Sequence, residues 1–230
     1  MNQLIQKMEL PAPQLYVLKS IKEERQFRLD ILDQNGAGAK DRFLSTLAAA
    51  FPEDQREPIL QAFKFACRID YDHVGLSPES YLAHPLRVTE MVMSYFQPVC
   101  QDAAVIALLH NVLEVSAINL IELEEAFGRI VKDSISNLTV DRERQWDPVY
   151  KRDYYQKIRQ DHKAAGAVKV FDKLDNVFML CLNDNEKIRT VYLDEIEEHV
   201  IPLAQECVPA VTDYFKAAAA EARIFGHLTR

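Results

Sequence analysis

The chain has 230 residues, of which 48% are hydrophobic and 27% are charged, as is typical of a globular protein with a sizeable core. Its net charge of −8 excludes the domain-wide positive field of a nucleic-acid-binding protein, but leaves room for a local basic pocket. No apolar run approaches the roughly 18 residues that span a bilayer, and the first residues include no apolar stretch of signal-peptide length. We therefore expect a cytoplasmic protein with neither a nucleic acid nor a membrane as its partner.

The four cysteines lie far apart and form no CxxC pair. A disulfide framework is typical of short secreted chains, and a zinc ribbon needs paired spacings. The pattern therefore favours four reduced thiols.

Helical spacing and helix caps recur along the chain, whereas alternating strand patterns bounded by turn residues are hard to find. The sequence predicts helices at residues 14–32, 40–50, 57–71, 84–96, 101–116, 119–127, 129–139, 147–162, 165–182, 186–204 and 207–225. Ser77-Pro78 has the form of an N-cap followed by a first-turn proline, and His84-Pro85 is expected to open the next helix. We predict an all-α fold, with one helical bundle at 36–230 and an N-terminal helical extension at 1–35.

Polar residues interrupt the most apolar helix, 101–116, at His110, Asn111 and Glu114. At about 100° per residue in a continuous helix, all three would share one narrow face. Such groups cannot be buried without partners. They either hydrogen-bond to the rest of the bundle or line a cavity that holds water, a metal or a ligand.

The predicted helix 165–182 carries a second polar face, made of Lys169, Asp172, Lys173 and Asn176. Taken alone, this face is what any amphipathic helix presents to solvent.

Several stretches follow one another in the order and with the spacing of a known domain. They are 62–66 (AFKFA) with 81–88 (YLAHPLRV), 107–114 (ALLHNVLE), 127–131 (FGRIV), 168–176 (VKVFDKLDN) and 202–204 (PLA). Over about residues 40–205 they resemble the HD-superfamily hydrolase domain of RelA/SpoT-type alarmone enzymes, of the small, stand-alone type.

The resemblance implies an HD-domain helical bundle that holds one divalent ion, typically manganese, through a first His, a His-Asp doublet and a later Asp. In that family the ion and a nearby Glu-Asp pair promote the attack of water that removes the 3′-pyrophosphate from guanosine tetra- or pentaphosphate. Such an ion lowers the pKa of water and holds phosphate oxygens, while a carboxylate handles the proton.

Carried over by position, the resemblance assigns the metal to Asp70, His110, Asn111 and Asp172. The first ligand falls on Asp70 by counting back from His84. The doublet is His-Asn here rather than His-Asp, so a neutral amide stands in place of one anionic ligand.

The same comparison makes Glu114 the general acid or base, because the second acid of the pair is replaced by Val115. Asn176 matches the residue that contacts the nucleotide, and Lys169 or Lys173 would meet the phosphates. The family's basic guanine-pocket pair falls on Gly75-Leu76.

Three hypotheses follow. The first is a divergent metal-dependent phosphohydrolase that uses Mn²⁺ or Mg²⁺ and acts on a nucleotide or another phosphorylated small molecule. The second is a catalytically inactive HD-fold protein, without a metal, that binds a nucleotide or a protein partner. The third is a helical scaffold whose former site is filled by hydrogen bonds such as one from His110 to Asp172. The sequence does not decide whether the protein is an enzyme, and it is compatible with a homo-oligomer.

Overall fold

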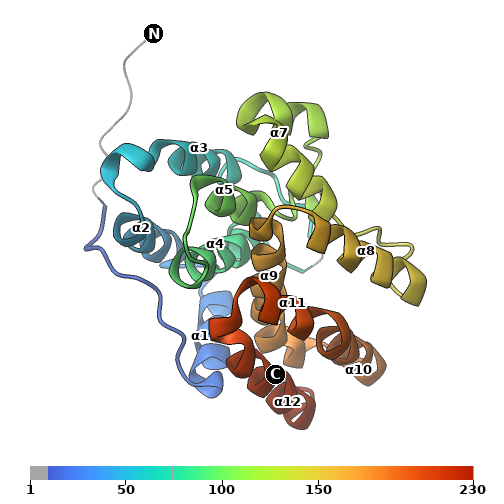
Figure 1. Ribbon diagram of the computed structural model, residues 1–230. Coiled ribbons are helices and arrows are strands. Elements are labelled where there is room, and N and C mark those ends of the chain that lie inside the picture. The colour runs from blue at the N-terminus through green and yellow to red at the C-terminus, as the bar shows by residue number, and fades with distance from the viewer. Residues whose placement is uncertain (1–9, 74, 230) are drawn as a thin grey trace.

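A computed structural model describes residues 10–73 and 75–229 of the chain. The described part consists of helices and connecting loops, without a β-strand (Figure 1). The α-helices are α1 Ile21–Asp33, α2 Ala39–Ala50, α3 Glu57–Ala66, α4 Pro78–Tyr95, α5 Gln101–Leu109, α6 Val112–Val115, α7 Leu120–Leu138, α8 Pro148–Gln160, α9 Lys163–Met179, α10 Glu186–Glu195, α11 Ile201–Cys207 and α12 Thr212–Phe225. The predicted all-α fold is confirmed.

Helix α9 is the axis around which the others are arranged (Figure 1). It packs against α4 and α5 on one side, and against α11, α12 and α1 on another. Nearly all of its side chains are buried, including charged ones. Helix α5 is likewise buried from Ala103 to Leu109. Helices α5 and α9 therefore lie side by side in the core.

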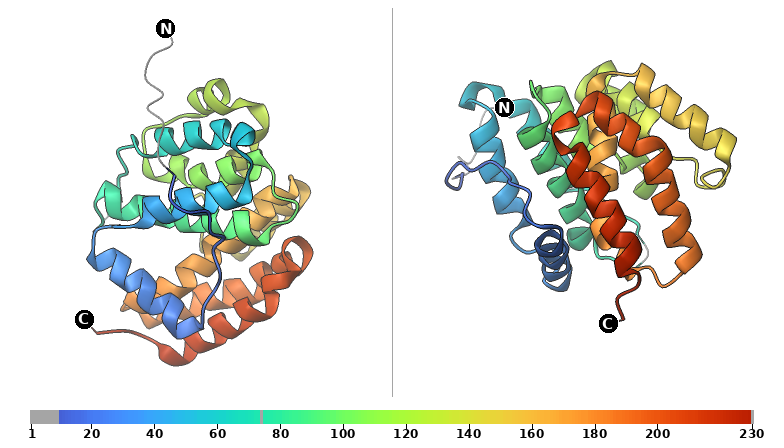
Figure 2. Two further views of the ribbon diagram at one scale, coloured as in Figure 1. Left: turned by 90° about the vertical axis from the view of Figure 1, so that its left-hand side faces the viewer. Right: turned by 60° about the horizontal axis from the view of Figure 1, so that its bottom comes forward.

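The N-terminal segment differs from the prediction, because the helix expected from residue 14 begins only at Ile21. Ser20 and Glu23 form a reciprocal capping box that starts α1. Before it, the chain crosses the bundle as an extended strap (Figure 2). The backbone N–H groups of Tyr16 and Leu18 bond there to the side chains of Ser94 and Tyr95. These long-range partners replace the helical hydrogen bonds of the strap.

Helix α4 is longer than predicted, because Ser77 caps a helix that runs through the expected start at His84-Pro85. Pro85 lies inside this helix, where it removes one backbone hydrogen bond without ending the helix. His84 is consequently a residue of the helix interior rather than of a helix end.

The predicted helix 101–116 is broken where its polar residues begin. Helix α5 ends at Leu109, Asn111 has φ −116° and ψ 8°, and the short helix α6 follows. His110, Asn111 and Glu114 therefore do not share a face of one continuous helix, so this prediction was wrong. Further along, Gly128 with φ 82° kinks α7 between the two helices that the sequence predicted there.

Helix α1 packs against α9, α4 and α12, and it buries Ile31 in the main hydrophobic core. Among the described residues, no helix is both long enough and apolar enough to cross a membrane.

The turn between α1 and α2 depends on Gly36. Its φ is +78°, and a Cβ built there would lie 2.7 Å from the carbonyl oxygen of Glu79. We predict that Gly36→Ala lowers the free energy of unfolding by more than Gly38→Ala does. Gly38 shares the positive φ but has open space, so its variant should lose only about 1–2 kcal/mol. Urea unfolding of both variants measures the difference, and equal losses would contradict the close contact.

A second prediction concerns Glu90, which is fully buried on α4. Neither carboxylate oxygen is hydrogen-bonded, and Arg42 Nε lies 3.5 Å from Oε2 as an ion-pair partner. Burial raises its pKa from the ordinary 4.5 to about 7, although Arg42, Arg87 and Arg28 act to lower it. The folded state therefore favours the protonated acid, and stability falls as the pH rises from about 4.5 to 7. We expect Glu90→Gln to match the wild type at pH 4.5 and to exceed its unfolding free energy by about 3 kcal/mol at pH 8.5. A difference that does not vary with pH would refute this.

Candidate functional site

Three helices bring His84, His110 and Asp172 together. His84 comes from α4, His110 directly follows α5, and Asp172 lies in the middle of α9. One ligand atom from each lies within 4.8 Å of the other two. His84 Nε2 is 3.3 Å, and His110 Nε2 is 3.7 Å, from Asp172 Oδ1. Two imidazoles and a carboxylate therefore point at one small volume.

The tautomer of His110 is fixed by the backbone. Its Nδ1 lies 2.8 Å from the carbonyl oxygen of Ala107, which can only accept, so Nδ1 carries the hydrogen. The neutral ring then presents a lone pair at Nε2. That nitrogen is buried and has no hydrogen-bond partner, although it faces the carboxylate of Asp172. The expected direct hydrogen bond from His110 to Asp172, on which the scaffold hypothesis relied, is not formed.

His84 lies between two carboxylates of α9. Its Nδ1 is 2.8 Å from Asp175 Oδ2, while its Nε2 faces Asp172. Burial lowers the pKa of His84, but the hydrogen bonds to Asp172 and Asp175 outweigh burial, so that its pKa is raised overall. A positive charge between these carboxylates, whether a proton or another cation, is therefore stabilised.

Asp172 is held as an anion. Burial favours its neutral form, but the charge of Lys169 and the contact with His84 keep its pKa well below the usual range. Lys169 Nζ lies 2.9 Å from Oδ2, and Asn176 Nδ2 donates to Oδ1 over 2.8 Å. Three of the predicted site residues on α9 thus meet at one carboxylate.

These residues line a cavity of about 840 Å³ between α4, α8, α9 and α10. Six cations and four acids line it, namely Arg28, Arg87, Arg142, Lys151, Lys169, Lys173, Glu114, Asp172, Asp175 and Glu195. Its wall is therefore net positive in a chain whose overall charge is −8. Five tyrosines and Trp146 also line the cavity.

Asn111 and Glu114 also line this cavity, but both are already engaged. Asn111 donates from Nδ2 to the hydroxyl of Tyr81. Glu114 accepts from the backbone N–H of Val140 over 2.9 Å and pairs with Arg142. Glu114 is thus bound at both oxygens, and any role in proton transfer requires Arg142 to move.

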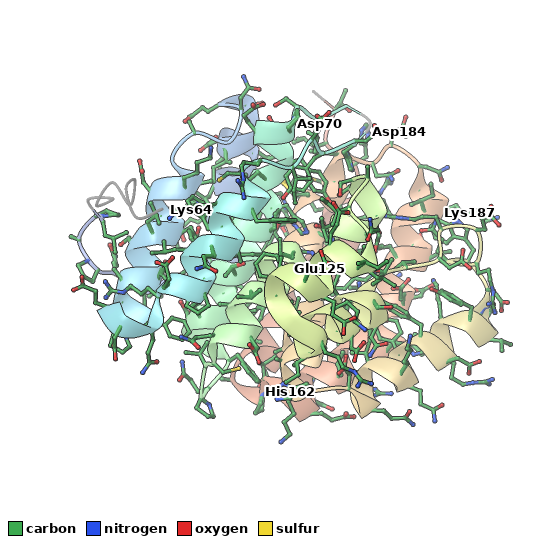
Figure 3. The ribbon with its side chains drawn as sticks, turned by 90° about the horizontal axis from the view of Figure 1, so that it is seen from above. Lys64, Asp70, Glu125, His162, Asp184 and Lys187 are labelled. Carbon is green, nitrogen blue, oxygen red and sulfur yellow. The ribbon has the colours of Figure 1, made fainter. Side chains whose placement is uncertain are left out.

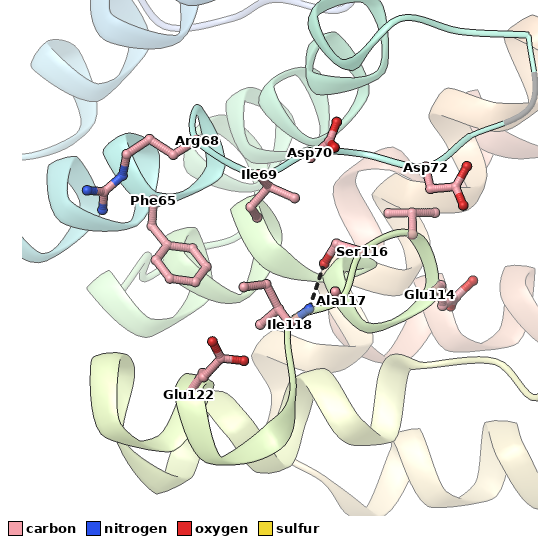
Figure 4. A pocket seen from close by; sticks show the side chains of 11 residues that line it. Phe65, Arg68, Ile69, Asp70, Asp72, Glu114, Ser116, Ala117, Ile118 and Glu122 are labelled. Carbon is pink, nitrogen blue, oxygen red and sulfur yellow. Dashed lines mark hydrogen bonds between the residues drawn. The ribbon is translucent and has the colours of Figure 1, made fainter.

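Asp70 is not brought to the histidines. It is exposed on the segment that follows α3, and the charged residues labelled with it in Figure 3 are exposed as well. With Asp72 it lines a second hollow, whose other wall consists of residues 114–118 and Glu122 (Figure 4). Within the described part of the chain, the group that could hold a metal consists of His84, His110 and Asp172. His84 therefore takes the ligand position that the resemblance had assigned to Asp70.

Sequence reasoning used His84 only as a reference position and overlooked it as a ligand. The available signal was the spacing in α4, where His84, Arg87 and Glu90 recur at every third residue among apolar neighbours. Glu195 was missed entirely. It joins Lys173 and Lys151 at 2.7 and 2.8 Å, from three different helices, and no sequence spacing could link them.

The donor set suits a divalent transition-metal ion. His110 Nε2 is an orphaned buried acceptor, and imidazole nitrogens are preferred by transition metals, whereas Mg²⁺ takes oxygen ligands. Two histidines and one carboxylate therefore suit a divalent transition-metal ion better than Mg²⁺.

The comparisons with known proteins fit this architecture. No family model and no curated protein matches the chain. A solved structure, described as a metazoan ortholog of SpoT that hydrolyzes ppGpp and plays a role in starvation responses, matches with a TM-score of 0.59 at 18% identity. The match covers 74% of this chain and 97% of that one. This chain shares the all-α fold of that structure. About a quarter of it lies outside the match.

We predict that Mn²⁺ raises the melting temperature of the wild-type chain, because an ion that binds only the folded state stabilises it. His84→Ala and His110→Ala should abolish the shift, whereas Asp70→Asn should leave it unchanged. Differential scanning fluorimetry with and without Mn²⁺ measures all four proteins. A shift that survives in His84→Ala but disappears in Asp70→Asn would show that Asp70, and not His84, is the metal ligand.

Proposed function

We propose that the chain is a divergent HD-type, metal-dependent phosphohydrolase that acts on a nucleotide or another phosphorylated small molecule. The observation that carries this proposal is the buried, unpaired Nε2 of His110, which faces His84 and Asp172 inside a net-positive cavity. The fold that the chain shares with a ppGpp hydrolase gives independent support.

His84, His110 and Asp172 would hold the ion, and the amide oxygen of Asn111 would be a weak additional ligand. When bound, the ion supplies Lewis acidity and lowers the pKa of water. The carbonyl of Ala107 keeps His110 in the tautomer with a free Nε2, so this ring needs no rearrangement to act as a ligand.

The lysines of the cavity would bind the phosphates. Lys169 already lies at Asp172, and Lys173 and Lys151 share the carboxylate of Glu195. Because each ammonium group has three donors and only one is used in each of these ion pairs, donors remain for phosphate oxygens. Asn176, next to Asp172 on α9, would add a contact to the bound molecule.

Glu114 would act as the general acid or base. Its carboxylate lies in the wall of the same cavity as His110, and Arg142 holds it there from an exposed position. Exchange of the Arg142 pair for a hydrogen bond to water or to a leaving oxygen would release one carboxylate oxygen for proton transfer.

The alternative is a catalytically inactive protein of the same fold that binds a nucleotide or a protein partner. It is favoured by the way the polar groups satisfy one another: Lys169 neutralises Asp172, and Arg142 neutralises Glu114. A metal-free cavity of this kind still offers lysines and tyrosines to a nucleotide.

Metal analysis and a hydrolysis screen decide between these two functions. The protein is purified with added Mn²⁺, its metal content is measured, and release of phosphate or pyrophosphate is followed over guanosine tetraphosphate and other nucleotides. Near-stoichiometric metal and a turnover that His110→Ala abolishes would support the hydrolase. Protein without metal and without turnover, but with a nucleotide that binds, would establish the alternative.

Asn111→Asp should convert the His-Asn doublet into the His-Asp doublet of the resembled family. An added anionic ligand should tighten Mn²⁺ binding by about tenfold and raise any hydrolase rate, because the charge of the ligands sets cation affinity. Asn111→Ala is the matched control, since it removes the amide without adding charge. Isothermal titration with Mn²⁺ gives the affinities, and equal values for both variants would exclude residue 111 from the metal site.

A further inference from the structure

A second carboxylate of α9, Asp175, lies behind His84 and takes no part in the proposed metal site. It is fully buried, and its two oxygens receive four charge-assisted hydrogen bonds. Oδ2 accepts from His84 Nδ1 and from Arg87 Nη2, each over 2.8 Å. Oδ1 accepts from Arg87 Nε over 2.9 Å and from Arg28 Nε over 2.7 Å.

We propose that Asp175 is a positioning residue that fixes the tautomer and ring direction of His84, and that Arg28 of the N-terminal helix α1 completes this support. The inference rests on the proposed metal site, since it assigns the support of one of its ligands. It also gives residues 21–33 a role in the site, as the source of Arg28.

The geometry separates the roles of the two carboxylates of α9. Asp172 faces Nε2 of His84, whereas Asp175 faces Nδ1 on the opposite side of the ring. A hydrogen bond from Nδ1–H to an ionised carboxylate leaves the lone pair at Nε2, where it points at Asp172 and His110. Carboxylates that bind the second nitrogen of a ligating histidine in this way hold its orientation and raise its basicity.

Asp175 needs more than one cation because burial strongly opposes its charge. Arg87 and Arg28, together with His84, keep its pKa well below the usual range. Arg87 occupies one edge of the carboxylate with a two-pronged contact, and Arg28 reaches the remaining lone pair of Oδ1. With every acceptor direction taken by a positive donor, the carboxylate has one orientation.

Arg28 is itself locked in place. Its side chain is fully buried, pairs with Glu24 one turn earlier in α1, and stacks on Phe178 of α9 at 4.3 Å. The same helix offers a matched comparison in Arg25, which pairs with Glu221 of α12 and stacks on Phe225 at 4.0 Å. The two arginines share a helix, an acidic partner and an aromatic neighbour, but only Arg28 reaches Asp175.

The first test reads the tautomer of His84 by NMR of ¹⁵N-histidine-labelled protein without metal, at a pH high enough for the ring to be neutral, because the two carboxylates raise its pKa. The wild type should show a ring proton on Nδ1 of His84 that is protected from exchange, assigned by its absence in His84→Asn. In Asp175→Asn the guanidinium donors of Arg28 and Arg87 take the amide oxygen, and the amide NH₂ group is left facing Nδ1. The proton should then move to Nε2. A wild-type His84 without a protected Nδ1 proton would overturn the proposal, even if the variant fails to fold.

The second test measures Mn²⁺ affinity by isothermal titration in folded protein, with the circular-dichroism melt of each variant recorded alongside. Asp175→Asn should weaken binding by about 10–100-fold. Arg28→Met should weaken it less, because Arg87 remains, and Arg25→Met should leave it unchanged although it too removes a buried arginine and an ion pair. Equal Mn²⁺ affinities for Arg28→Met and Arg25→Met would exclude α1 from the support of the site.

The two proposals fail in distinguishable ways. A wild type that shows the protected Nδ1 proton but binds no Mn²⁺ would disprove the metal-dependent function and leave the support of His84 in place. If Asp175→Asn binds Mn²⁺ as tightly as the wild type does, the positioning role is disproved, whereas the metal site is not.

Discussion

Two ionised carboxylates are buried on the central helix, and the arrangement of the surrounding helices depends on the need to stabilise their charge. Asp172 and Asp175 lie one turn apart on α9, where an unpaired charge would be prohibitive. Each therefore needs cationic or hydrogen-bonding partners: Lys169 on the same helix, His84 and Arg87 from α4, and Arg28 from α1. Helices far apart in the sequence are thus tied to one point, and the metal-capable group is assembled by the same contacts that neutralise the core.

The part of this arrangement that is local in sequence could be predicted. Caps at Ser77 and Asn119, and the apolar runs of α5 and α9, indicate the helices, and the polar interruptions at His110 and Asp172 indicate the site. The rest depends on contacts across the fold. The strap before Ser20 satisfies its backbone through Ser94 and Tyr95, and the pairing of His84 with Asp175 spans 91 positions, so no periodicity could reveal either.

Overall charge and local charge have separate consequences in this molecule. The excess of acidic residues is a property of the whole chain, whereas the cavity wall carries six cations against four acids. Gly75 and Leu76 add no charge to the cavity wall, but Lys151 and Lys173 line it from α8 and α9, where both pair with Glu195. A polyanion would therefore be attracted by the cavity itself, while the acidic exterior opposes its approach from a distance.

The balance between the two candidate functions depends on Lys169. Its ammonium group lies 2.9 Å from Oδ2 of Asp172 and already neutralises the one carboxylate in the metal-capable group. A divalent ion must therefore bind against this positive charge, or Lys169 must turn toward a phosphate and release Asp172. With a second acid at position 111, a divalent ion would compete effectively with Lys169 for Asp172. With Asn111 in that place, Lys169 leaves Asp172 more readily when an anionic substrate is present to pair with its ammonium group. Under the proposed hydrolase function, a metal ion and a phosphorylated ligand should therefore bind with positive coupling, each raising the affinity for the other.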